Sequence, residues 1–85
     1  MVIINIYSTR FCPYCTRAKM LLEQKGMEYN EIRIDVDSDR RHEMMKLSGR
    51  TSVPQIFFGD EHIGGCDDLY HLESQGELDT KLGLA

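Results

Sequence analysis

Two thiols lie three positions apart in this chain, at Cys12 and Cys15, with Pro13 and Tyr14 between them. Residues i and i+3 share one face of a helix, so a helix that begins at Pro13 brings both sulfur atoms close enough to form a disulfide or to bind one metal ion. The spacing therefore indicates either redox chemistry or a metal site.

Pro13 favours a helix start, because its φ is already helical and it lacks an N–H group that the first turn would leave unpaired. The remaining free N–H groups point towards Cys12, and with the positive end of the helix dipole they favour a thiolate there. We therefore expect Cys12 to be the nucleophile. Cys15, one turn inside the helix and more shielded, is expected to resolve a mixed disulfide formed on Cys12.

Length and composition predict a single globular domain over residues 1–85. The chain is 41% apolar and 28% charged, and its net charge of −4 argues against a general nucleic-acid or anionic-membrane binder. The amino end has no basic region and too short an apolar run for a signal peptide or a membrane span. An odd number of cysteines with one close pair is typical of a reducing compartment, so we expect a cytoplasmic protein.

The elements that must position the thiols can be predicted from periodicity. The apolar run Val2 to Tyr7 indicates a central strand, and Pro13 to Lys25 a helix that ends at Gly26. Strict alternation from Glu31 to Val36 indicates a strand with one solvent-facing side at a sheet edge. A helix capped by the Asp37 to Asp39 segment is expected to run to about Ser48 and to end at Gly49.

The second half of the chain predicts a hairpin and further helix. Gln55 to Phe58 and Glu61 to Ile63 flank a Gly-Asp turn, Gly64-Gly65 leads into a helix through about Ser74, and Glu77 to Leu82 adds a last helical turn. We predict an α/β fold, a four-stranded mixed sheet with helices on both faces. The cysteine pair then lies at the carboxyl end of the first strand, where ligands bind in open α/β sheets.

Three motifs in this order resemble the dithiol glutaredoxins of the thioredoxin fold, and small bacterial members above all: Cys12-Pro13-Tyr14-Cys15, Thr51-Ser52-Val53-Pro54 and Gly64-Gly65-Cys66-Asp67-Asp68. The resemblance implies a monomeric enzyme of electron transport and cell redox homeostasis that uses glutathione, with no required metal, to reduce protein disulfides and glutathione mixed disulfides. Its implied partners are disulfide-containing or glutathionylated proteins, ribonucleotide reductase among them.

The resemblance also implies a glutathione site. Its members in this sequence are Arg10, Tyr14, Ser52, Val53, Pro54, Gly65, Cys66 and Asp67. Val53 precedes a proline and is biased towards an extended backbone, which leaves its N–H and C=O free to pair with a passing peptide. The proline at this position is cis in the family.

The Gly64 to Asp68 segment fits the charged γ-glutamyl end of glutathione. Gly64 and Gly65 allow close backbone approach, and the helix that begins near Cys66 offers free N–H groups to a carboxylate. We expect Asp67, ahead of Asp68, to meet the ligand's ammonium group. Helix capping by these carboxylates is compatible with that role.

The glycine carboxylate of glutathione requires a cation. Many family members place Lys or Arg three residues before the first cysteine, where this chain has Thr9, so Arg10 is the expected substitute. Arg40, Arg41 and Arg50 are the other candidates.

Cys66 is expected to be a small buried hydrophobe. Three alternative functions stay open from the sequence: a zinc site of Cys12, Cys15, His62 and Cys66, an iron–sulfur cluster shared between two subunits, and a redoxin recharged by thioredoxin reductase.

Overall fold

The computed structural model describes residues 2–85, and Met1, the first residue of the amino-terminal segment considered above, lies outside them. The strands are β1 (Ile4–Ser8), β2 (Asn30–Arg33), β3 (Gln55–Phe58) and β4 (Glu61–Gly64). The helices are α1 (Pro13–Gln24), α2 (Ser38–Ser48), α3 (Cys66–Ser74) and α4 (Leu78–Lys81). This order of elements is the predicted one.

The strands form one mixed sheet in the order β2-β1-β3-β4. β1 is parallel to β2 and antiparallel to β3, which is in turn antiparallel to β4. Tyr7 is registered with Gln55 and Ile56 with Gly64, so the carboxyl ends of β1 and β4 meet the amino end of β3. Three segments distant in sequence therefore converge at one end of the sheet.

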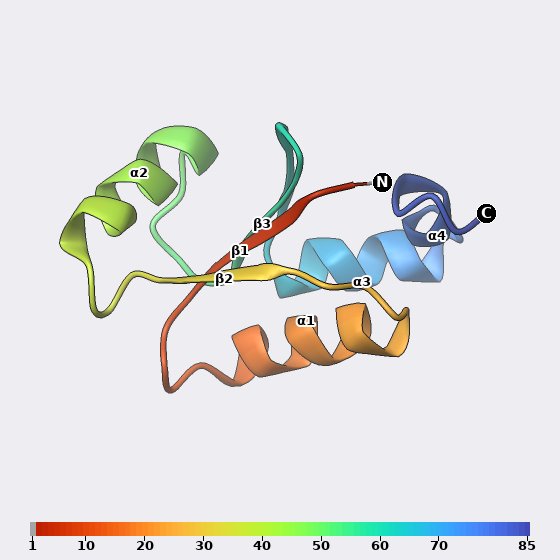
Figure 1. Cartoon of the computed structure of the whole chain (residues 1–85), viewed down its shortest axis with the longest axis horizontal. Helices are drawn as coiled ribbons and strands as arrows, with labels where there is room; N and C mark the ends of the chain where they lie inside the picture. The colour runs from red at the N-terminus through yellow and green to blue at the C-terminus, as the bar shows by residue number, and fades with distance from the viewer. Residues whose placement is uncertain (1) are drawn as a thin grey trace.

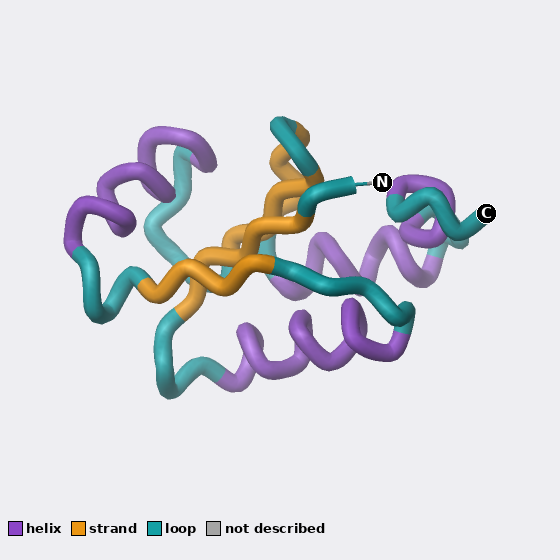
Figure 2. Tube along the Cα trace, in the orientation of Figure 1, coloured by secondary structure: helices purple, strands orange, loops and turns teal. Residues whose placement is uncertain are grey.

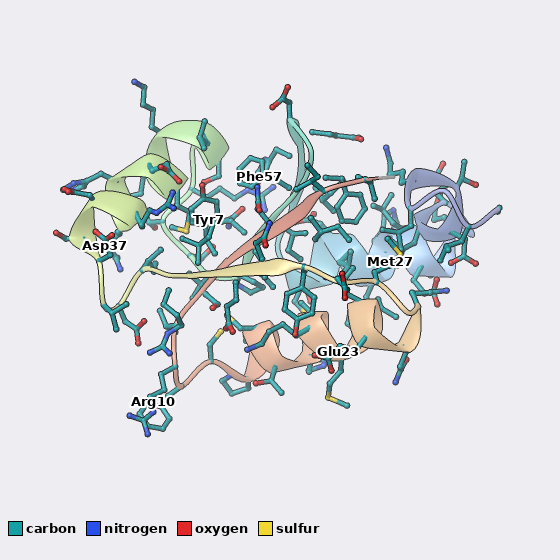
Figure 3. All side chains as sticks on the ribbon, in the orientation of Figure 1. Tyr7, Arg10, Glu23, Met27, Asp37 and Phe57 are labelled. Atoms are coloured by element: carbon teal, nitrogen blue, oxygen red, sulfur yellow. The ribbon has the colours of Figure 1, made fainter. Side chains whose placement is uncertain are left out.

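Helices cover both faces of the sheet, as predicted. Figure 1 shows α2 on one side, with α1 and α3 on the other, and Figure 2 shows the strands between them. Alternate side chains of β1 and β3 separate accordingly. Ile6 and Ile56 pack with Leu22 of α1 in the larger core, whereas Tyr7 and Phe57 pack with residues such as Met44 of α2 in the smaller one. Figure 3 labels Tyr7 and Phe57 on the α2 side.

Two predicted strands extend beyond those in the structure. The first begins at Ile4 rather than Val2, and Ile3 is largely exposed. The second ends at Arg33 rather than Val36. The Arg33 guanidinium binds the Asp35 carboxylate across a turn at 2.7 and 2.6 Å, and the Val36 side chain that follows is 74% exposed. The strand therefore ends before the alternating pattern does. The pairing of Arg33 with Asp35 turns the chain away from the sheet.

The predicted helix ends agree closely with the structure. The Asp37 carboxylate caps α2 by accepting from Asp39 N at 3.0 Å, and Gly49 ends it with a φ of 70°, which glycine adopts readily. In the described part of the chain, no helix has the length and apolar character that crossing a membrane requires.

Candidate active site

Cys12 is the residue that caps the amino end of α1. Its backbone is extended, with a φ of −138° and a ψ of 101°, and Pro13 follows as the first helical residue. The Sγ atom accepts a hydrogen bond from the backbone N–H of Cys15 at 3.1 Å. A free amide of the first turn therefore points at the sulfur, and such an N–H group stabilises a thiolate.

The two thiols of the pair differ in access to solvent. Cys12 is partly exposed, whereas Cys15 is 1% exposed, and both are free thiols. Burial, followed by the hydrogen bond with Cys12, raises the pKa of Cys15 to about 12. Cys15 is thus held as a neutral thiol beside a more accessible sulfur, which confirms the expectation that it is the more shielded of the two.

The loop before β3 lies against Cys12. The Val53–Pro54 peptide bond is cis, as the resemblance implied, and the Val53 carbonyl oxygen is 3.9 Å from the Cys12 sulfur. Val53 is partly buried and Pro54 is buried, whereas Thr51 and Ser52 are exposed. The backbone of this loop therefore borders the space that a substrate must enter to reach Cys12.

The start of α3 completes this end of the sheet. Gly65 lies beside the loop, since a Cβ atom there would be 3.4 Å from the Pro54 carbonyl oxygen. Its N–H donates to the Asp68 carboxylate at 2.8 Å, and Arg50 binds the same oxygen at 2.9 Å. The Arg50 guanidinium lowers the pKa of the Asp68 carboxyl, followed in effect by the Gly65 amide. Asp68 therefore joins α3 to the chain after α2.

The position of the Asp68 side chain leaves no room for a side chain at residue 64. The φ of Gly64 is +116°, and a Cβ atom at this position would be 2.3 Å from the Asp68 carboxylate oxygen. The sequence suggested that both glycines make room for a ligand, whereas the geometry gives Gly64 a different role: it allows the chain to turn tightly around the capping carboxylate.

Comparisons with known proteins agree with this geometry. A family model described as Glutaredoxin matches residues 4–63. The chain belongs to the glutaredoxin family. Glutaredoxin 3 of Escherichia coli is 54% identical over 82 residues, which cover 96% of this chain and 99% of that protein. As a glutaredoxin, the chain is an oxidoreductase that acts on thiols and disulfides with glutathione.

Two solved glutaredoxins share the fold over nearly the whole chain. The solution structure of glutaredoxin from Brucella melitensis has a TM-score of 0.86 and 52% identity, and the match covers 99% of this chain and 91% of that one. The crystal structure of a buckwheat glutaredoxin–glutathione complex has a TM-score of 0.88 and 33% identity, with 96% and 77% covered. The predicted thioredoxin-like fold is thereby confirmed.

The remaining predicted site residues differ in how the glutaredoxin fold places them. Tyr14 is 55% exposed on the first turn of α1, and Asp67 is exposed at the start of α3. The Cys66 side chain is 4% exposed within the larger core, and burial raises its pKa. The expectation of a small buried hydrophobe is confirmed.

The candidate arginines are not equivalent. Arg50 is bound to Asp68, and Arg40 is bound to Glu43 at 2.8 Å. Arg10 lies at the outer tip of the loop between β1 and α1, where its guanidinium stacks over the Phe11 ring at 5.1 Å from the ring centroid (Figure 3). Its backbone N–H donates to Asp35 at 3.1 Å. Arg10 therefore has a fixed backbone and a side chain without a carboxylate partner among the described residues.

The four residues of the zinc alternative do not form a site. His62 Nε2 is 2.7 Å from the side-chain oxygen of Gln55, and Cys66 points into the core. Across residues 2–85, no group of three or more His, Cys, Asp or Glu side chains is arranged to hold a metal ion. The geometry therefore gives the zinc alternative no support.

Sequence reasoning missed Gln55, which is fully buried directly after the cis proline. Its signal was present, since one polar side chain opens a strand that is otherwise Ile-Phe-Phe. A polar side chain in a continuously buried strand requires hydrogen-bond partners, and these partners show which part of the chain it keeps in position.

Proposed function

We propose that Cys12 is the nucleophile and Cys15 the resolving thiol of this glutaredoxin. The observation that carries the proposal is the 3.1 Å hydrogen bond from the Cys15 amide to the Cys12 sulfur, combined with the contrast in exposure between the two thiols. An accessible thiolate attacks disulfides, whereas a buried neutral thiol acts only after its neighbour has formed a mixed disulfide.

With a glutathione mixed disulfide, the Cys12 thiolate attacks the glutathione sulfur. The old S–S bond breaks, the substrate leaves as a thiolate, and glutathione is joined to Cys12. The thiolate of a second glutathione then attacks this adduct, which gives oxidised glutathione and restores the Cys12 thiolate. Cys15 is not needed for this route.

With a protein disulfide, both thiols are used. Cys12 attacks one sulfur of the substrate, and the second substrate sulfur leaves as a thiolate. Cys15 then loses its proton and attacks the Cys12 sulfur, which releases the reduced protein and leaves Cys12 and Cys15 joined. Two glutathione molecules reduce this disulfide. Phe11, 87% exposed beside Cys12, offers apolar surface to such a protein substrate.

Glutathione is proposed to lie between the cis-proline loop and the start of α3. The Val53 backbone would pair with the ligand's cysteine, flanked by Ser52 and Pro54. The Gly65 backbone would let the ligand approach closely, the amides of Cys66 and Asp67 would bind the γ-glutamyl carboxylate, and the Asp67 side chain its ammonium group. The proximity of Gly65 to Pro54 supports this placement, and so does the glutathione complex of the buckwheat relative.

The other end of glutathione carries a glycine carboxylate. We assign Arg10 to it, because Arg10 lies in the loop that leads to Cys12 and has no carboxylate partner in residues 2–85, unlike Arg40 and Arg50. Arg41 has no such partner among these residues either, but it lies on α2 and not in this loop. Tyr14, exposed on the first turn of α1, would pack against the ligand.

We further propose that one domain over residues 1–85 acts as a cytoplasmic monomer in electron transport and cell redox homeostasis, without a required metal. Its substrates would be disulfide-containing or glutathionylated proteins, ribonucleotide reductase among them. The odd, unpaired cysteine set supports a reducing compartment.

The test is turnover of a glutathionylated peptide by the purified, metal-free protein. One reaction contains glutathione, glutathione reductase and NADPH, and a parallel reaction contains thioredoxin reductase and NADPH. We expect turnover with glutathione alone. Activity only with thioredoxin reductase would favour the alternative redoxin, and inactivity in both reactions would direct attention to an iron–sulfur cluster.

A further inference from the structure

Gln55 is a buried polar residue that directly follows the cis-proline loop. It is the first residue of β3 and follows Pro54 directly, and its side chain is 0% exposed. The amide nitrogen lies 3.0 Å from the Ser52 carbonyl oxygen and 3.4 Å from the Ser52 hydroxyl. The amide oxygen lies 2.7 Å from His62 Nε2 on β4. A buried amide is thus hydrogen-bonded on both sides.

The direction of these bonds follows from the chemistry of the groups. The Ser52 carbonyl can only accept, so the Gln55 amide must present its NH₂ group to it. The amide oxygen then faces His62, and His62 must donate from Nε2. Burial lowers the pKa of His62 and Arg50 lowers it further, against an opposing effect of Asp68, so the neutral ring is favoured. One neutral tautomer, with its proton on Nε2, fits the arrangement.

Residues of the sheet hold His62 in place. His62 stacks on Phe57, with ring centroids 4.9 Å apart, and the register pairs these two residues across β3 and β4. Phe57 in turn packs in the smaller core with Tyr7. Packing against the sheet therefore fixes the position of His62. Gln55 is hydrogen-bonded to both His62 and Ser52, so it links Ser52 to this fixed ring.

Ser52 has little other support. It is exposed, and the hydrogen bonds recorded for it in the described part of the chain both come from Gln55. The next residue, Val53, carries the carbonyl group 3.9 Å from the Cys12 sulfur. A rotation of the Ser52 carbonyl would reorient the peptide that follows it, and with it the Val53 backbone.

We propose that Gln55 and His62 are positioning residues: the chain of hydrogen bonds from His62 through Gln55 to the Ser52 carbonyl sets the orientation of the Val53 backbone that receives glutathione. This inference rests on the proposed function, because it assigns the Val53 backbone to the ligand. Neither side chain touches the reacting sulfur atoms, so their effect is on binding geometry rather than on the exchange step.

Two substitutions remove the hydrogen bonds while keeping volume. Gln55→Met removes both the NH₂ group that faces Ser52 and the oxygen that faces His62. His62→Phe keeps an aromatic ring against Phe57 but removes the N–H group that faces Gln55. We expect each to raise the KM for a glutathionylated peptide by about fivefold while kcat stays within about twofold. The double variant should raise KM no further than Gln55→Met alone, because the two residues act in one chain.

The matched control is Ile56→Val, a fully buried change in the same strand, at a side chain that packs in the larger core and takes no part in the hydrogen bonds to Ser52. It lowers stability but is expected to leave KM unchanged. Nitrogen-15 NMR of the imidazole gives a second readout, with the His62 proton on Nε2 in the wild type and a mixture of tautomers in Gln55→Met.

The inference is overturned if folded His62→Phe and Gln55→Met both keep the wild-type KM, or if the wild-type His62 ring carries its proton on Nδ1. Should Gln55→Met fail to fold, His62→Phe and the NMR measurement still decide. If the wild type itself does not turn over the glutathionylated peptide, the proposed function fails instead, which distinguishes the two outcomes.

Discussion

The backbone N–H of Cys15 donates to the sulfur of Cys12 at 3.1 Å, while the thiol of Cys15 is 1% exposed. One residue thus contacts the pair in two separate ways: its amide donates to the Cys12 sulfur, and its side chain supplies the second thiol. Substitution of the Cys15 side chain keeps the amide, so the two can be separated by mutation.

Cys12→Ser should abolish the reduction of both glutathionylated peptides and protein disulfides. Cys15→Ser should keep the first activity within about threefold and lose the second, because the amide still faces Cys12. Both activities are measured by coupling to glutathione reductase. Persistent deglutathionylation by Cys12→Ser would reject Cys12 as the nucleophile.

Alkylation should distinguish the cysteines by their burial. Iodoacetamide at pH 8 is expected to add once to the native reduced protein, at Cys12, because Cys15 and Cys66 are buried and burial raises the pKa of each thiol. Unfolding in guanidinium chloride should allow three additions, which mass spectrometry counts. Rapid labelling of native Cys15 at pH 8 would contradict the structure.

Stability should decrease at alkaline pH for the same reason. Burial raises the native pKa of Cys15 to about 12 from its ordinary value of 9.0, so the native state retains a proton that the unfolded chain releases between these values. The free energy of unfolding contributed by this residue is present below about pH 9 and is lost as pH rises towards 12. Urea denaturation from pH 8 to 10.5 measures the slope, and Cys15→Ala should reduce it.

Asp67 and Asp68 should separate binding from stability. Asp67→Ala is expected to raise the KM for glutathione with a smaller effect on kcat, and to change the free energy of unfolding by less than about 0.5 kcal/mol, because its side chain is exposed. Asp68→Ala should lower that free energy by about 1 kcal/mol, since it removes the cap on Gly65 and the partner of Arg50. An unchanged KM in Asp67→Ala would remove Asp67 from the site.

Gly64→Ala should destabilise the fold more than Gly49→Ala. Both glycines have positive φ, but a Cβ at Gly64 would meet the Asp68 carboxylate, whereas one at Gly49 has open space. We expect a cost of about 1 kcal/mol at Gly49 and about 3 kcal/mol at Gly64. Urea denaturation of the two variants tests the difference, and equal costs would show that the Asp68 side chain moves aside freely.

Much of this architecture could be predicted from the sequence, because its signals are local. Pro13 marks the start of α1, Asp37 and Gly49 bound α2, and continuous apolar runs mark the central strands. Val36 shows the limit of such signals. Its place in the alternating pattern was as good as that of Ile34, yet the pairing of Arg33 with Asp35 ends the strand first.

The sequence predicted those site residues that belong to a local motif. It did not predict contacts between residues that are distant in sequence. The motif around Cys12 locates the proposed nucleophile by itself. The contact of Arg50 with Asp68 spans 18 positions, and the bond from His62 to Gln55 depends on strand register. Sequence alone could not choose among four arginines, because their neighbours are fixed only by the tertiary fold.

The convergence of β1, β3 and β4 at one end of the sheet has a consequence for the unfolded chain. Cys12 and the Val53 carbonyl are 41 positions apart and meet only when the antiparallel strands are paired. A fragment that stops before Gln55 would keep the cysteine motif but would lack β3, which brings the Val53 carbonyl to Cys12. Glutathione-dependent turnover is therefore a direct reporter of the folded fraction, and its recovery during refolding should follow pairing of β1 with β3 rather than formation of α1.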